Sequence, residues 1–123
     1  MSTPRALLGA AGEEAAARHL VAQGYRVVAK NHRCRRGEVD LVVEKGEVLA
    51  FVEVRTRSSA LFGGPAASVG FHKQRRVIAA ARDFLAHWRG PERAVRFDVV
   101  AIAPGPEGEE LSHLPGAFDA QGY

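Results

Sequence analysis

The sequence contains a single cysteine, Cys34, among 123 residues. One cysteine cannot form an internal disulfide, and no second cysteine or nearby histidine gives it zinc-finger spacing. No segment approaches the ~18 apolar residues that a membrane span needs, and no charged segment followed by a long apolar run resembles a signal peptide. These absences predict a protein of the reducing cytoplasm that has no membrane partner.

Two further kinds of site lack their sequence signatures. The segment Gly9-Ala10-Ala11-Gly12 has neither the lysine nor the spacing of a phosphate-binding loop. The five histidines are scattered along the chain without the spacing of metal ligands. The sequence also contains no internal repeat, so it indicates neither a repeat protein nor a nucleotide-binding loop.

The chain does contain an average share of apolar residues and an uneven distribution of charge. Apolar residues make up 46% and charged residues 25%, which suits one globular domain of this length. Four of the 14 acidic residues and none of the 17 basic ones lie in the last 21 positions, so residues 1–102 carry 17 basic and 10 acidic residues, a net charge of +7. This excess makes a polyanionic partner plausible, although a solvated basic face would look the same.

The pattern of apolar and turn residues predicts the order αβββαβ. Helices are expected over 11–23 and 72–88, strands over 25–31, 39–43, 48–54 and 95–102, and a surface loop over 56–70. The second and third strands should form an antiparallel hairpin, and the last strand should lie parallel to the third. We therefore expect a single α/β domain over 1–103, with a mixed four-stranded sheet flanked by helices, and an acidic, loosely ordered tail over 104–123.

The predicted hairpin brings acidic residues together. If its loop is Lys45-Gly46, Asp40 lies opposite Phe51, and Glu53 becomes its diagonal neighbour at roughly 7 Å. Buried carboxylates are costly unless they are paired, and a divalent cation between these two would offset the cost. The hairpin therefore predicts a metal site at Asp40 and Glu53.

The two predicted helices point to the same site. Glu13 shares a face with the apolar residues of the first helix, although an acid near a helix N-terminus also interacts favourably with the helix dipole. Lys73, Arg75 and Arg76 begin the second helix, where positive charge opposes the dipole. A bound phosphate would make their position favourable, whereas screening by salt and water would merely make it tolerable.

Several spaced motifs stand out along the chain: Gly12-Glu13-Glu14-Ala15-Ala16, Gly24-Tyr25, Asn31-His32-Arg33, Gly37-Glu38-Val39-Asp40-Leu41-Val42, Phe51-Val52-Glu53-Val54-Arg55-Thr56-Arg57, Phe62-Gly63-Gly64-Pro65, Lys73-Gln74-Arg75-Arg76 and Arg96-Phe97-Asp98-Val99-Val100. Together these motifs resemble those of the YraN family of small bacterial proteins. They cover roughly residues 9–102. The resemblance implies a restriction-endonuclease-like fold similar to that of Holliday junction resolvases.

The resemblance also implies roles for individual residues. Asp40 and Glu53 match the acids that bind Mg²⁺ or Mn²⁺, Glu13 matches the helical acid, and Arg55 stands where the catalytic lysine is expected. Arginine cannot act as a general base, so any hydrolysis would depend on metal-bound water.

The implied activity is metal-dependent endonucleolytic cleavage of DNA, including branched or structured DNA. The residues expected to contact the nucleic acid are Arg33, Arg35, Arg36, Arg57, Lys73, Gln74, Arg75 and Arg76. The alternative is a nucleic-acid-binding module that keeps the nuclease fold without turnover. Because resolvase-like enzymes usually work as dimers, the resemblance also leaves a homodimer open.

Overall fold

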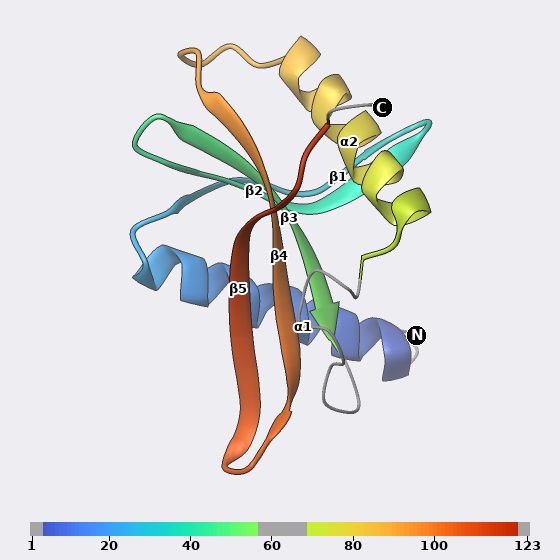
Figure 1. Ribbon diagram of the computed structural model, residues 1–123, viewed down its shortest axis with the longest axis vertical. Coiled ribbons are helices and arrows are strands. Elements are labelled where there is room, and N and C mark those ends of the chain that lie inside the picture. Colours follow the sequence, from blue (N-terminus) through green and yellow to red (C-terminus); the bar gives the residue numbers. More distant parts are fainter. Residues whose placement is uncertain (1–3, 57–68, 121–123) are drawn as a thin grey trace.

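A computed structural model of the chain describes residues 4–56 and 69–120, with side chains from Ala10 onward (Figure 1). The elements follow in the order α1 (Pro4–Ala22), β1 (Arg26–Cys34), β2 (Gly37–Lys45), β3 (Val48–Thr56), α2 (Phe71–Ala86), β4 (Ala94–Gly105) and β5 (Gly108–Phe118). Helix α1 ends at Ala22, and Gly24, two residues later, has a φ of 96°, the left-handed conformation that commonly follows the end of a helix. Most of the predicted loop over 56–70 lies outside the described residues.

The five strands form one mixed sheet in the order β1-β2-β3-β4-β5. Strands β1, β2 and β3 pair antiparallel, β4 pairs parallel with β3, and β5 pairs antiparallel with β4. The structure confirms the predicted single α/β domain, the antiparallel β2–β3 hairpin and the parallel β3–β4 pair. The sheet is open, with five strands rather than the predicted four.

The core has two halves, one on each face of the sheet. Against α1 the buried residues are Ala16, Ala17, Leu20, Leu41, Val43, Ala50, Val52, Val100 and Ile102. Against α2 they are Val39, Val42, Leu49, Phe51, Val77, Ile78, Ala80, Ala81 and Phe97. Alternate residues over 41–43 of β2 and 49–52 of β3 therefore face different helices, and the sheet lies between two helical layers, as Figure 1 shows.

The predicted loosely ordered tail over 104–123 is wrong for most of its length. Strand β4 continues to Gly105, and 108–118 form β5, which pairs along β4 from Phe97↔Phe118 to Gly105↔Gly108. Their hairpin is the long arm that extends past α1 at the bottom of Figure 1. Most side chains of β5 are exposed or half-buried, so the strand lacks the alternating apolar pattern by which strands are recognised.

The register of the β2–β3 hairpin also differs from the prediction. Lys45 pairs with Val48, so the loop is Gly46-Glu47, and Phe51 lies opposite Val42 instead of Asp40. Gly46 has a φ of 59°, and glycine adopts this left-handed conformation without steric cost. The predicted register is therefore displaced by two residues, which leaves Val42, Leu49 and Phe51 together on one face as predicted. Val39 joins them on that face, although simple alternation would place it with Leu41 on the other.

Candidate functional site: an acidic pair beside a basic helix

Asp40 and Glu53 lie together where strands β2 and β3 stop pairing. The last pair of the ladder is Leu41 with Val52, and the two acids are the next residue on each strand. The Val54 amide donates a hydrogen bond of 2.8 Å to Asp40 Oδ2. The carboxyl groups of Asp40 and Glu53 also lie within hydrogen-bonding reach of each other. The two acids thus form a direct pair rather than the diagonal pair that the sequence predicts.

Burial and mutual repulsion change the ionisation of this pair. Burial is the main cause that raises the pKa of Asp40 to about 8, and both the hydrogen bond and the charge of Glu53 raise it further. The Val54 amide and the charge of Lys73 oppose this shift. At neutral pH the pair therefore keeps a proton that two separate carboxylates would release.

Glu53 is the most enclosed acid of the site. It is 1% exposed, and its Oε2 has no hydrogen-bond partner among the described residues. Lys73 Nζ, from the first turn of α2, lies 3.1 Å from this oxygen without hydrogen-bonding geometry and 3.6 Å from Glu38 Oε1. A buried carboxylate oxygen without a hydrogen bond is expensive, so this position is suited to a cation.

Glu13 reaches the pair from the opposite helical layer. Burial is the main cause that raises its pKa, and the charge of Asp40 adds to the shift. A hydrogen bond with Asn31 opposes it. Asn31 has a φ of 50° in β1, between residues that pair with Leu41 and Val39, so it flanks Asp40. The predicted helical acid therefore adjoins the two strand acids.

The acids offer a suitable but incomplete set of metal ligands. Among the described residues, no three His, Cys, Asp or Glu side chains are arranged to hold a metal ion. Mg²⁺, however, is commonly bound by one or two carboxylates, with water and substrate phosphate completing its coordination. Asp40 and Glu53, with the unpartnered Oε2 of Glu53, fit that kind of site.

The other predicted site residues have different positions. Arg55 is half-buried two positions after Glu53 and makes no ion pair with a described residue. Arg33 is exposed and lies 3.3 Å from Glu38. Gln74 donates a hydrogen bond of 2.9 Å to the Val69 carbonyl, which ties it to the segment before α2. Arg57 lies outside the described residues.

The remaining predicted arginines gather around α2. A shallow cleft of about 370 Å³ is lined by Arg36, His72, Arg75, Arg76, Ile78, Ala79 and Arg82. We call it the basic cleft.

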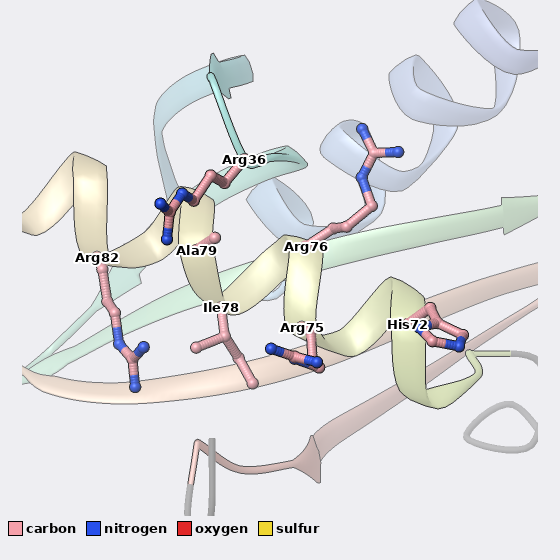
Figure 2. A pocket seen from close by; sticks show the side chains of 7 residues that line it. All are labelled: Arg36, His72, Arg75, Arg76, Ile78, Ala79 and Arg82. Atoms are coloured by element: carbon pink, nitrogen blue, oxygen red, sulfur yellow. The ribbon is translucent and has the colours of Figure 1, made fainter.

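Figure 2 shows how the side chains of the basic cleft are arranged. Arg36 reaches from the β1–β2 turn toward Ala79, while Arg75 and Arg82 extend from α2 on either side of Ile78. None of the described residues that line the cleft is a carboxylate, so it is suited to a polyanion. Arg35 lies beside it, together with Arg36, Ala79 and Arg82.

Close contact fixes the β1–β2 turn against α2. Gly37 is buried, and a Cβ atom added to it would lie 1.9 Å from the carbonyl oxygen of Arg76. Only glycine permits this approach. The contact holds Arg36 beside the arginines of α2.

Sequence reasoning missed the position of Lys73 beside Glu53 and the contact between Asn31 and Glu13. The spacing of residues along the helix could have revealed the position of Lys73. Lys73 precedes the buried Val77 by four residues, so it shares the helix face that packs on the sheet. Asn31 was harder to recognise because its left-handed conformation within a strand has no periodic signature.

Comparison with known proteins gives a family match over most of the chain. The profile of the Uncharacterised protein family UPF0102 matches residues 12–102. A UPF0102 protein of Anaeromyxobacter dehalogenans is 52% identical over 118 residues, which cover 96% of this chain and 88% of the relative. UPF0102 proteins of Myxococcus xanthus and Symbiobacterium thermophilum are 53% and 48% identical over 114 residues, covering 91% and 92% of this chain and 89% and 97% of theirs.

The helices were also compared with the requirements of a membrane span. Neither helix among the described residues is both long and apolar enough to cross a bilayer.

Proposed function

This chain belongs to the UPF0102 family, the YraN group that its motifs resemble, and we propose that it is a metal-dependent endonuclease acting on DNA. The observation that carries the proposal is the pair Asp40 and Glu53. One oxygen of Glu53 is buried without a hydrogen-bond partner, and the pair lies beside the helix that forms the basic cleft. A purely structural acid pair would need neither a buried oxygen without a hydrogen bond nor a neighbouring basic cleft.

Asp40 and Glu53 would hold Mg²⁺ or Mn²⁺, and Glu13 would contribute from the opposite side of the pair. When bound, such an ion polarises a phosphodiester and lowers the pKa of a coordinated water. Asp40 must lose its proton to bind a cation, and its pKa of about 8 places that loss close to neutral pH. The protein would therefore bind metal more tightly as the pH rises toward about 8.

The basic residues would position the DNA backbone. Arg36, Arg75 and Arg76 present guanidinium groups around one cleft, and such groups bind phosphate through paired hydrogen bonds. Arg55 adjoins Glu53 on the same strand and would neutralise charge on the phosphate that is cleaved. Because an arginine stays protonated, we assign it no general-base role.

Cleavage of a labelled four-way junction and of a linear duplex tests the proposal. We expect nicks in the presence of Mg²⁺ or Mn²⁺, no cleavage with excess chelator, and no metal-dependent cleavage by Asp40→Asn or Glu53→Gln. Glu47→Gln, in the exposed hairpin loop, is the matched control and should cleave normally. Cleavage that survives both site variants would show that these acids are not the site.

The second candidate function is DNA binding without turnover. Two observations favour it: Arg55 replaces the expected lysine, and among the described residues no three His, Cys, Asp or Glu side chains are arranged to hold a metal ion. The same variants separate the candidates. A binding module would retain DNA affinity in Glu53→Gln and would show no cleavage with any divalent ion.

A further inference from the structure

Lys73 is the cation that the structure places at the acidic pair. Its ammonium group lies 3.1 Å from Glu53 Oε2 and 3.6 Å from Glu38 Oε1, and its side chain is only 28% exposed. Of the chain's three lysines, Lys30 is exposed on β1, and Lys45 donates to the Gln23 carbonyl. Neither of these reaches the pair in the structure.

The ammonium group of Lys73 and a divalent cation would compete for the same oxygen. Glu53 Oε2 is the buried atom without a hydrogen bond, and Lys73 is its only ion-pair partner among the described residues. A carboxylate oxygen held by an ammonium group is less available to a metal, and the positive charge also repels the metal.

The contact is suited to being broken. Lys73 has a flexible four-carbon stem and lies in the first turn of α2, next to the exposed His72 and the basic cleft. Its ammonium group interacts with Glu53 without hydrogen-bonding geometry, so its release loses a charge contact but no well-formed hydrogen bond. Glu38 can retain the released group because it is one-third exposed and already contacts it.

We propose that Lys73 is a built-in competitor of the metal ion: it occupies Glu53 in the metal-free protein and yields that oxygen when a divalent cation binds. This inference rests on the proposed function, because it assumes the metal site at Asp40 and Glu53. It adds a regulatory property to that site. Because Lys73 competes for Glu53, the site would fill only at a higher concentration of the divalent cation than it would without Lys73.

Titration with Mn²⁺ by calorimetry tests the competition. Removal of the charge in Lys73→Met should lower the Kd for Mn²⁺ by about tenfold, the scale of one partly screened charge contact. Lys73→Arg keeps the charge and should bind Mn²⁺ within about twofold of the wild type. Arg75→Met removes a charge from the same helical turn, where the side chain lines the basic cleft instead of contacting the acids, and it should also change Kd by less than about twofold.

The outcomes separate this inference from the proposed function. If wild type and Lys73→Met bind Mn²⁺ with equal affinity, or if Arg75→Met tightens binding equally, the competition is wrong while the metal site stands. If neither wild type nor Lys73→Met binds Mn²⁺, the metal site itself is wrong and the inference falls with it.

A measurement on the unmodified protein covers the case in which Lys73→Met does not fold. Lysine acetylation can be followed residue by residue by mass spectrometry, with the exposed Lys30 as the internal reference. Mn²⁺ should raise the acetylation rate of Lys73 relative to Lys30, because the released ammonium group becomes accessible. An unchanged ratio at saturating Mn²⁺ would overturn the proposal.

Discussion

Asp40 and Glu53 adjoin each other at the end of the β2–β3 ladder, one residue beyond its last pair, and their carboxyl groups are close enough to share a proton. At this end of the ladder Lys73 of α2 contacts Glu53, and Glu13 of α1 contacts Asp40. Each helix packs on its own face of the sheet, yet one side chain from each helix reaches the same pair of acids.

The first prediction concerns the stability of the metal-free protein as a function of pH. The pKa of Asp40 rises from 3.8 to about 8 on folding, so the folded state binds more protons than the unfolded state between those values. The free energy of unfolding should therefore fall as the pH rises through this window. Asp40→Asn should flatten that decline. Urea unfolding in chelator at about pH 5 and about pH 8 measures it.

Glu47→Gln serves as the control for this pH dependence. Glu47 is exposed in the hairpin loop, so its replacement should leave the decline unchanged. If Asp40→Asn kept the wild-type decline, the shared proton would belong to another group.

Sequence reasoning recovered the pairing of the central strands for identifiable physical reasons. The apolar runs of β2 and β3 are joined by a loop that contains Gly46, and Gly24 adopts the left-handed conformation just after the end of α1. The two-residue error in register left Val42, Leu49 and Phe51 on the one face where they were expected. For this reason Asp40 and Glu53 were expected close together even though their partners were misassigned.

The parts that the sequence did not reveal depend on tertiary contacts. Strand β5 lies at the edge of the sheet, where Pro115 is tolerated and few side chains are buried, so its composition resembles that of a loop. The place of Lys73 depends on how α2 docks, which in turn depends on the fit of Gly37 against the Arg76 carbonyl. No local pattern contains that information.

The second prediction concerns this docking contact. Gly37→Ala would place a Cβ atom 1.9 Å from a backbone oxygen of α2, so the turn or the helix must move. We expect a loss of about 1–3 kcal/mol in the free energy of unfolding. Gly70→Ala is the matched control because a Cβ there meets nothing within 4 Å and φ is −73°. Its effect should stay within about 0.5 kcal/mol. Equal effects in a chemical-denaturation experiment would contradict the close contact.

The third prediction concerns a buried charge network away from the acidic pair. Asp98 is fully buried, and Arg96 Nε and Nη2 each donate a hydrogen bond to it at 2.8 Å. His113 Nε2 lies 2.8 Å from Asp98 Oδ2, and the Gly116 amide donates at 3.1 Å to Oδ1. The network joins β4 to β5. Arg96→Met should therefore cost about 3–5 kcal/mol, because it leaves a buried carboxylate without its arginine partner.

The change in the free energy of unfolding at low pH provides a second test of the role of Arg96. Burial alone would raise the pKa of Asp98, but the hydrogen bonds from His113, Arg96 and Gly116 outweigh it and hold the pKa below its ordinary value. The stability that this provides is present above pH ~4 and lost as the pH falls further. Arg96→Met raises the pKa of Asp98 in the folded state toward or above its ordinary value, so the variant should lose less stability than the wild type between about pH 4 and lower pH. Arg26→Met, which breaks the ion pair between the exposed Arg26 and Glu44, should destabilise the protein much less than Arg96→Met and is the control.

The fourth prediction concerns the salt dependence of DNA binding at the basic cleft. Each phosphate contact releases condensed counterions, so the slope of log affinity against log salt falls by about 0.9 for every contact that is removed. Arg75→Met and Arg76→Met should each reduce the slope by about one, and the double variant by about two.

Arg18→Met is the control for this prediction. Arg18 is exposed on α1 beside Glu14, so its replacement removes the same charge away from the cleft and should leave the slope unchanged. Anisotropy titrations with a labelled duplex at several salt concentrations measure the slopes. If all three single variants weaken binding equally at unchanged slope, the cleft does not contact the backbone, and the affinity arises from the overall charge of the molecule.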